Sequence, residues 1–219
     1  MKRIMLFVST AALMVCLSAC GTKDANKQAA ASDEQEALTP AEKDLEAAAD
    51  GEATASAKYA AFADQAAQEG LPQIEALYRA TSKAESIHLA NHQKALREKN
   101  IMGYKPKVGH FEVKTTAENL KASIEGESYE SATMYPNFIK DAKGEYADTA
   151  VKSFQWAWAA EKNHAKLYAA ALANINNPKK LARVYYVCPT CGNVYDSKQS
   201  SDCEICKTPA YKFLKFAAK

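Results

Sequence analysis

Two Glu-x-x-His motifs are the clearest chemical signal in this 219-residue sequence. They pair Glu85 with His88 in the segment AESIH, and Glu161 with His164 in the segment AEKNH. Residues three apart share one face of a helix, so each pair can bind one metal ion. A single motif of this kind is common on solvated helices. Two copies at matching positions of a repeated sequence indicate a metal site.

A Gly-Glu dipeptide precedes each motif and completes the repeat. Glu52 lies 33 residues before Glu85, and Glu127 lies 34 residues before Glu161. One glutamate from each of two helices, with a Glu-x-x-His motif from each of two others, is the ligand set of di-iron and di-manganese carboxylate bundles. Buried groups of this kind need cations to balance their charge. We therefore predict a two-metal site that suits iron or manganese, although the ligands do not exclude zinc.

The two copies of the repeat differ by one residue and one carboxylate. In the second copy, GESYESATMYPNF, Tyr135 comes one residue later after its glutamate than Tyr59 does in the first copy, GEATASAKYAAF. Glu130 also stands where the first copy has Ala55. An inserted residue within a helix can be absorbed as a π turn, and such turns are frequent at functional sites. We predict a π turn between Glu127 and Tyr135.

Four cysteines near the C-terminus form a second candidate metal site. The segments VCPTCG and CEIC give two Cys-x-x-Cys knuckles separated by eleven residues. Two such knuckles typically make a tetrahedral site of four sulfurs, which we favour over the disulfides that a secreted chain could form. A module of about 30 residues also has too small a core to be stable without a cross-link such as a bound metal or disulfides. The spacing does not distinguish zinc from iron. The predicted ligands are Cys188, Cys191, Cys203 and Cys206.

Four helices are needed to position these residues. The first is predicted to begin at Thr39, where Glu42 can close a capping box, and to end near residue 68. The second is expected at 72–99, the third starts at Thr115, and the fourth ends near residue 174. A few residues join the helices of each pair, whereas about fifteen, enough to span roughly 50 Å, join the two pairs. The sequence predicts a mainly α-helical chain: a ferritin-like four-helix bundle with one long crossover.

The start of the chain has the features of an export signal. Lys2 and Arg3 precede a short apolar run that ends in LSACG, which is similar to the lipobox of bacterial lipoproteins. We expect residues 1–19 to be a cleaved signal peptide and Cys20 to be lipidated, which would anchor the protein to a membrane on its periplasmic or cell-surface face. A plain cleaved signal is the alternative. Residues 20–38 are polar and aperiodic and are predicted to be a flexible tether. Cleavage takes the formal charge from +2 to zero, which argues against nucleic acid as a partner.

The order of these motifs resembles that of the rubrerythrin family. The patterns GE…Y..FA, AE..H, TAENL…GE..E…MYP and E..H…Y occur in sequence, and the resemblance covers nearly all of residues 40–216. It implies a ferritin-like di-iron domain at 39–176 and a rubredoxin-like domain with an Fe(Cys)4 site at 182–219. It also implies that Glu85 and Glu161 bridge the two irons.

The resemblance divides the remaining ligands between the two irons. It implies that Glu52 and His88 bind one iron, and that Glu127 and His164 bind the other. Glu130 would be an additional ligand that exchanges with His88 when the first iron changes its oxidation state.

Four further residues are interpreted as having roles other than metal ligation. The resemblance implies that Tyr59 and Tyr135 hydrogen-bond the carboxylates. His92, one turn after His88, is interpreted as lying beside the site or at the surface and not as a ligand. In the second cysteine knuckle, Lys207 stands where glycine is usual in rubredoxin-like modules. A left-handed conformation there would cost about 1–2 kcal/mol without removing a ligand.

These assignments predict a peroxidase that protects against oxidative stress. The di-iron site would give two electrons to hydrogen peroxide, and the rubredoxin-like iron would return them one at a time. The chain has no Gly-rich dinucleotide fingerprint, so we expect an external electron donor. The resemblance also implies a head-to-tail homodimer that places one chain's rubredoxin-like site near the other chain's di-iron site. A single chain's tail is not otherwise expected to reach the site. The alternative function is ferroxidase activity with iron storage, against which the cysteine module argues because a store needs no electron entry.

Overall fold

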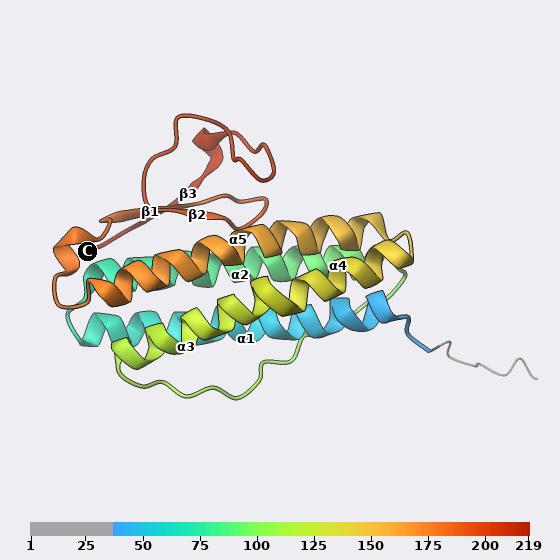
Figure 1. The fold of residues 1–219 in the computed structure, drawn as a ribbon, viewed down its shortest axis with the longest axis horizontal. Helices are drawn as coiled ribbons and strands as arrows, with labels where there is room; N and C mark the ends of the chain where they lie inside the picture. The colour runs from blue at the N-terminus through green and yellow to red at the C-terminus, as the bar shows by residue number, and fades with distance from the viewer. Residues whose placement is uncertain (1–36) are drawn as a thin grey trace, which may run out of the picture. The chain divides into compact units, whose positions relative to one another are not determined.

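A computed structural model describes residues 37–219, and Figure 1 shows a helical bundle with a small module along one side. The predicted signal peptide, the predicted lipidation site at Cys20 and most of the predicted tether lie outside the described residues. Among the helices of the described part of the chain, none is long and apolar enough to cross a membrane.

The first two helices form an antiparallel pair. Helix α1 (Pro40–Gln68) begins with the predicted capping box, in which Thr39 and Glu42 each accept a hydrogen bond from the other's backbone N–H. Helix α2 (Pro72–Glu98) begins at a proline, after a turn in which Gly70 has a φ of 70°. Both helices lie within a residue or two of their predicted bounds.

The second half of the bundle contains the predicted π turn. Helix α3 (Thr116–Tyr129) continues directly into the π-helical turn η1 (Glu130–Met134) and then into helix α4 (Tyr135–Gly144). Helix α5 (Asp148–Ala173) follows after a short connection. The extra residue of the second repeat is therefore absorbed as a π turn, and this prediction is confirmed.

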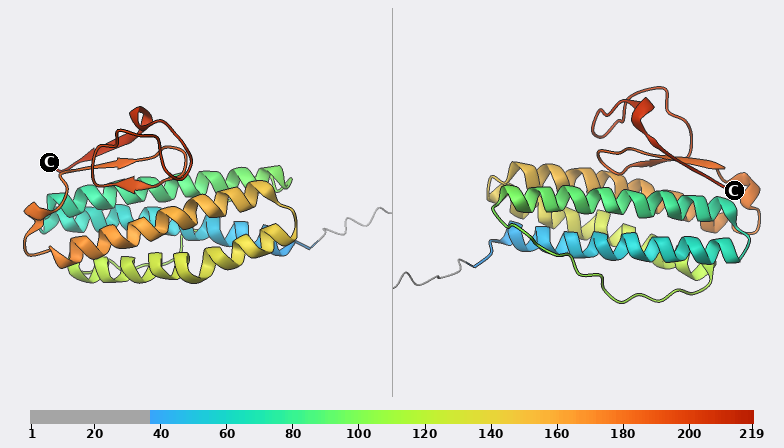
Figure 2. Two further views of the ribbon diagram at one scale, coloured as in Figure 1. Left: turned by 45° about the horizontal axis from the view of Figure 1, so that its top comes forward. Right: turned by 180° about the vertical axis from the view of Figure 1, so that it is seen from behind.

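One long connection crosses between the two helix pairs along the outside of α1 (Figure 2). It is tied down by hydrogen bonds to that helix: Asp50 accepts from the Tyr104 hydroxyl and from the Lys107 N–H, both at 2.8 Å. Thr54 accepts from the Gly109 N–H, also at 2.8 Å. The fold is the predicted mainly helical, ferritin-like bundle with one long crossover.

Two apolar clusters fill the bundle, one toward each end of the helices. Their aromatic members include Tyr59, Phe62, Tyr78 and Tyr168 in the first cluster, and Tyr135, Phe138 and Phe154 in the second. The polar residues of the Glu-x-x-His repeat lie along the helices between these two clusters. An uncompensated charge in such a dry layer would be costly.

A three-stranded antiparallel sheet in the order β2-β1-β3 organises the C-terminal module. Its elements are the 3-10 helix η2 (Pro178–Lys180), β1 (Val184–Val187), β2 (Val194–Tyr195), the 3-10 helix η3 (Ala210–Lys212) and β3 (Leu214–Ala217). Alternate residues of β1 face the bundle, and Tyr185 and Val187 join its first apolar cluster. The module thus packs against α2 and α5 of its own chain (Figures 1 and 2).

Candidate metal centres

The structure brings six of the seven predicted di-metal ligands together in the middle of the bundle. They form two groups of four whose ligand atoms lie within 4.8 Å of one another. The groups are Glu52, Glu85, His88 and Glu161, and Glu85, Glu127, Glu161 and His164. Glu85 and Glu161 belong to both groups, which is the arrangement expected of bridging carboxylates.

Each ligand histidine points its Nδ1 atom at the two shared glutamates. His88 Nδ1 lies 2.9 Å from a Glu85 oxygen and 2.8 Å from a Glu161 oxygen. His164 Nδ1 lies 3.3 Å from Glu85 and 2.7 Å from Glu161. The i, i+3 spacing produces the approach within each helix, and the packing of α2 against α5 produces the approach between them.

These inward-facing atoms are buried and have no hydrogen-bond partner outside this ligand set among the described residues. They include both carboxylate oxygens of Glu85 and Glu161, and the Nδ1 atoms of His88 and His164. All four residues are at most 1% exposed. Buried carboxylates at this density need compensating cations. Carboxylate oxygens and imidazole nitrogens suit iron or manganese, so the residues fit a two-metal site.

The crowded charges also shift the acidities of the ligands. Burial favours neutral His164, but the shared glutamates outweigh it and raise its pKa to about 10. Burial and the charges of the shared glutamates raise the pKa of Glu127 well above its usual value. Burial opposes the ionisation of Glu52, but the charge of His88 outweighs this effect and lowers the pKa of Glu52. Metal binding at this site must therefore displace tightly held protons.

Two tyrosines hold the outer glutamates, and each does so across the repeat. Tyr59 of the first copy donates to Glu127 Oε1 of the second copy at 2.6 Å. Tyr135 of the second copy donates in turn to Glu52 of the first copy. The expected tyrosine–carboxylate bonds are present, and each copy of the repeat orients a ligand of the other.

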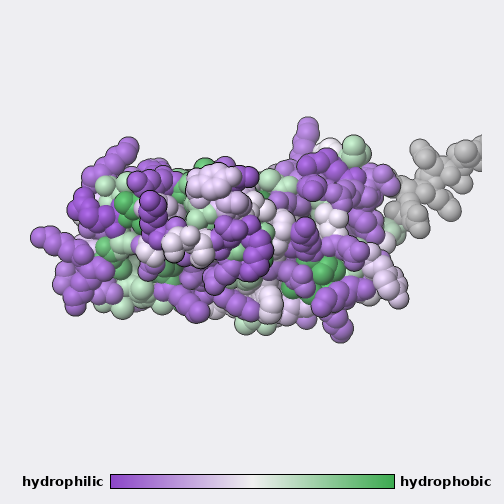
Figure 3. Space-filling model, turned by 90° about the horizontal axis from the view of Figure 1, so that it is seen from above, coloured by the Kyte–Doolittle hydropathy of each residue, from purple (hydrophilic) through white to green (hydrophobic). Residues whose placement is uncertain are grey.

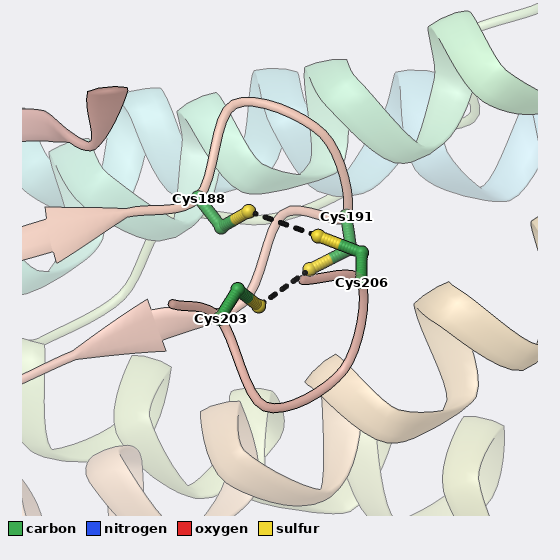
Figure 4. A group of neighbouring side chains, drawn as sticks. All are labelled: Cys188, Cys191, Cys203 and Cys206. Atoms are coloured by element: carbon green, nitrogen blue, oxygen red, sulfur yellow. Dashed lines mark hydrogen bonds between the residues drawn. The ribbon is translucent and has the colours of Figure 1, made fainter. Parts of the chain in front are cut away.

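The four cysteine sulfurs converge from two loops of the module (Figure 4). The Sγ atoms of Cys188 and Cys206 are 3.4 Å apart, and those of Cys191 and Cys203 are 3.5 Å apart. Within the described chain all four thiols are free. Hydrogen bonds from Cys188 and Cys191 lower the pKa of Cys203, whereas hydrogen bonds to Cys188 and Cys203 raise the pKa of Cys191. The geometry fits a site of four thiolates around iron or zinc.

A residue in the left-handed conformation closes each cysteine knuckle. The φ angles are 77° at Gly192 and 62° at Lys207. Lys207 therefore has the strained conformation that the sequence suggested, and its amine donates to the Glu204 carbonyl at 3.1 Å. Glycine is needed at position 192 for a second reason, because a Cβ there would lie 2.3 Å from His88 Nε2.

The first knuckle is hydrogen-bonded to both ligand histidines. His88 Nε2 lies 2.9 Å from the Cys191 carbonyl, and His164 Nε2 lies 3.3 Å from the Gly192 carbonyl. A ring that donates through Nε2 leaves Nδ1 free for a metal, so these carbonyls favour the tautomer that the site needs. The expectation that a chain's tail does not reach its own site is wrong, because the module folds back onto α2 and α5.

The rubrerythrin family model matches residues 43–172 of this chain. The chain belongs to the rubrerythrin family. Nigerythrin of Nitratidesulfovibrio vulgaris is 36% identical over 172 residues, which are 78% of this chain and 84% of that protein. Rubrerythrin-2 of Clostridium acetobutylicum is 31% identical over 174 residues, 78% of this chain and 94% of that protein. The solved structure of fully reduced, all-ferrous nigerythrin resembles this chain with a TM-score of 0.76 and 32% sequence identity. The match covers 93% of this chain and 100% of that chain.

Rubrerythrin-family proteins are di-iron oxidoreductases that are generally linked to peroxide reduction. Within the ligand set expected for the family, Glu130 stands apart. It begins the π turn and lies outside both four-residue groups. The residue as a whole is half-buried, but burial of its carboxyl and the charge of Glu52 raise the pKa of Glu130 well above its usual value. Its role as a movable ligand stays a prediction.

Trp158 supports the π turn of this rubrerythrin-family bundle. A π turn changes the regular hydrogen-bond pattern of a helix and can leave a carbonyl without its usual helical partner. The Trp158 indole N–H donates to the Ser131 carbonyl within the turn at 2.7 Å. The wide turn that begins with Glu130 is thereby held against α5.

His92 is fully buried and belongs to a chain of donors that ends on a ligand. Because Tyr135 gives its proton to Glu52, its oxygen can accept from His92 Nε2, which lies 3.1 Å away. His92 Nδ1 then accepts from the Ser153 hydroxyl at 2.8 Å. Burial lowers the pKa of His92, which favours a neutral ring. The spacing from His88 placed His92 near the site, but nothing in the sequence indicated its bonds to Tyr135 and Ser153.

Proposed function

We propose that this chain is a non-haem di-iron peroxidase that reduces hydrogen peroxide to water, with electrons delivered through the four-cysteine site. The contact that carries this proposal is the hydrogen bond between His88 and the Cys191 carbonyl, which joins the two candidate sites within one chain. Iron bound in both sites would supply the redox chemistry, in which hydrogen peroxide takes up two electrons and two protons and becomes two molecules of water.

The residues around the site would hold the ligands and exclude water. Tyr59 and Tyr135 fix the orientation of Glu127 and Glu52 through their hydroxyl groups. The knuckle carbonyls fix the histidine rings from the outer side. The two aromatic clusters keep bulk water away from the helix interior, which strengthens the electrostatic interactions inside it.

Ferroxidase activity with iron storage is the alternative function. The same carboxylates and histidines could bind and oxidise iron for a store. The docked module favours the peroxidase, because a store needs no second site that delivers electrons. The first knuckle also contacts the outer nitrogens of both ligand histidines, a position suited to electron transfer into the bundle.

We also propose that the exported chain is anchored to a membrane through lipidated Cys20 and that it forms a homodimer. Both proposals rest on the sequence and on the resemblance to rubrerythrins. Mass spectrometry of the peptide that contains Cys20 tests the first, since an unmodified thiol would contradict lipidation. Sedimentation of the purified protein tests the second, and a monomer at micromolar concentration would contradict it.

The decisive experiment combines metal analysis with a peroxide titration. Protein purified without air should contain iron in both sites and show the visible absorption of ferric thiolate. After anaerobic reduction, stoichiometric peroxide should reoxidise both sites without release of superoxide or oxygen. A colourless, zinc-filled module would overturn the electron-delivery role. Reoxidation of the bundle while the cysteine site stays reduced would also contradict it.

A further inference from the structure

The module has a groove on the face of its sheet that points away from the bundle. Strand β1 alternates its residues between two faces, so Tyr186 points opposite to the buried Tyr185 and Val187. Tyr186 lines a hollow of about 360 Å³ together with Tyr211, which is 83% exposed, and Phe213. The groove therefore presents aromatic side chains to solvent on the outer side of the cysteine site.

The surroundings of this groove are strongly basic. From residue 178 to the C-terminus the sequence has eight Lys or Arg residues and three Asp or Glu residues, whereas residues 37–177 have sixteen and nineteen. All eight basic residues are exposed. They are Lys179, Lys180, Arg183, Lys198, Lys207, Lys212, Lys215 and Lys219. Among the described residues that line the groove, Lys198 and Lys215 are charged and none is acidic. Figure 3 shows this face of the protein as mainly hydrophilic.

A short path of aromatic rings leads from the groove to a cysteine sulfur. Phe213, in the groove lining, stacks on Tyr195 with ring centroids 5.3 Å apart and an interplanar angle of 16°. The Tyr195 hydroxyl donates to Cys203 Sγ at 3.4 Å. The opposite side of the module is closed, because Cys191 and Gly192 lie against the ligand histidines. An external donor must therefore approach from the outer side.

We propose that this basic, aromatic groove is the docking surface for the external electron donor, a small acidic redox protein. This inference rests on the proposed function, since it concerns the donor to the same cysteine site. Charge complementarity would speed the encounter, and the rings would bring the donor close to Cys203. An anionic lipid surface is the competing occupant of a basic face. The hollow shape and the ring path to the sulfur favour a protein donor.

The test measures reduction of the cysteine site in the iron-loaded full chain, without peroxide. A reduced ferredoxin of strongly negative charge serves as the acidic donor, and a zwitterionic viologen of zero net charge serves as the small reductant. At low ionic strength, the double variant Lys198→Glu, Lys215→Glu should lower the second-order rate constant with ferredoxin by at least about 10-fold. The rate with the viologen should not change. Added salt should slow the wild-type reaction with ferredoxin.

A matched double variant, Lys121→Glu with Lys140→Glu, changes the same charge at exposed positions on α3 and α4. It should leave both rates at their wild-type values. The proposal is overturned if both double variants slow the ferredoxin reaction equally, if the groove variant changes neither rate, or if it slows both reductants alike. A module that holds zinc overturns it as well.

The lipid alternative is tested on the Cys20→Ser chain with vesicles of phosphatidylglycerol and phosphatidylcholine. If the groove variant loses vesicle binding but keeps its rate with ferredoxin, the groove contacts membrane lipid and the proposal falls. Because the assay follows only the reduction step, its failure is separate from a failure of peroxide turnover. A chain that accepts electrons from ferredoxin but does not react with peroxide would contradict the peroxidase and leave the docking surface standing.

Discussion

The two ends of the di-metal site are built from the same repeat, yet they hold their glutamates differently. At the Glu127 end, Tyr59 lies among aromatic rings, with its centroid 5.4 Å from that of Tyr168. At the Glu52 end, Tyr135 has its centroid 5.9 Å from that of His92. Tyr168 and His92 are equivalent, since each comes four residues after its ligand histidine. The ring packing is therefore shared by the two ends.

The hydrogen bonds are not shared. Ser153 donates to His92, His92 donates to Tyr135, and Tyr135 donates to Glu52. The Tyr168 hydroxyl at the other end pairs with Thr81 instead. His92 Nε2 itself lies 3.8 Å from Glu52, so its effect on that carboxylate passes mainly through Tyr135. A chain of donors that points at a carboxylate favours its charged form. Glu52 should accordingly be a firmly held anionic ligand for the metal ion at its end of the site.

The largest expected effect comes from a ligand that both ends share. Glu161→Gln should remove metal from both ends, and peroxide turnover should fall by more than the roughly 10–100-fold typical of outer hydrogen-bond partners. Glu52→Gln and Glu127→Gln should each impair one end. Elemental analysis and turnover measure the outcome, with the exposed Glu125→Gln as the control. Full iron content in Glu161→Gln would show that this carboxylate is not shared.

Gly192→Ala should disturb the contact between the cysteine module and the Glu52 end of the di-metal site more than the contact with the other end. The new Cβ would meet His88 Nε2, whose bond to the knuckle is shorter than that of His164. A shift of about 1 Å at such a contact can slow a reaction by about 100-fold, so reoxidation of the cysteine site by peroxide should slow markedly. Stopped-flow absorption measures this rate. Gly144→Ala is the control, because its Cβ would have no neighbour within 4 Å; equal rates in the two variants would contradict the coupling.

His92→Leu tests the donor chain, and Tyr168→Phe is its matched control at the other end. We expect His92→Leu to lower metal affinity or turnover by about 10–100-fold, as is typical when an outer hydrogen-bond partner of a ligand is lost. Mössbauer spectra should show the change mainly in one of the two irons. His92→Gln, which keeps a donor, should restore part of the loss. Equal losses in His92→Leu and Tyr168→Phe would contradict a specific role of the donor chain, because Tyr168→Phe keeps the ring and removes only a hydroxyl that bonds Thr81.

The smallest effect should appear in the pH dependence of the metal-free chain. The pKa of His164 is raised from 6.5 to about 10, so the folded state binds its proton more tightly than the unfolded state does. Its contribution to stability is complete below pH 6.5 and is lost as the pH rises to about 10. The melting temperature should fall across that range. His164→Gln should flatten the dependence, and a melting temperature that rises with pH would contradict the assignment.

Local signals were enough to predict much of the fold and the ligand set. Thr39 begins its helix with the expected capping box, and Thr115 is the N-cap of the third helix, which was predicted to start there. The one-residue difference between the repeats located the π turn, because an extra residue in a helix must be absorbed near the place where it occurs. Six inward-facing ligands followed from helical spacing. The donor chain did not, since Ser153 and His92 are 61 residues apart and no periodicity relates them.

The sequence by itself determined which side chains could bind metal, on which helix faces they lie, and where the second repeat departs from the first. Helical periodicity is a local property, so the face on which a side chain lies can be predicted without knowing the partner helix. The tertiary structure alone decided that each tyrosine serves the glutamate of the other repeat. It also decided that Cys191 meets His88, which is 103 residues away. That contact depends on which face of β1 is apolar and on the path of the chain after α5, and it is realised only when Tyr185 and Val187 pack onto the bundle.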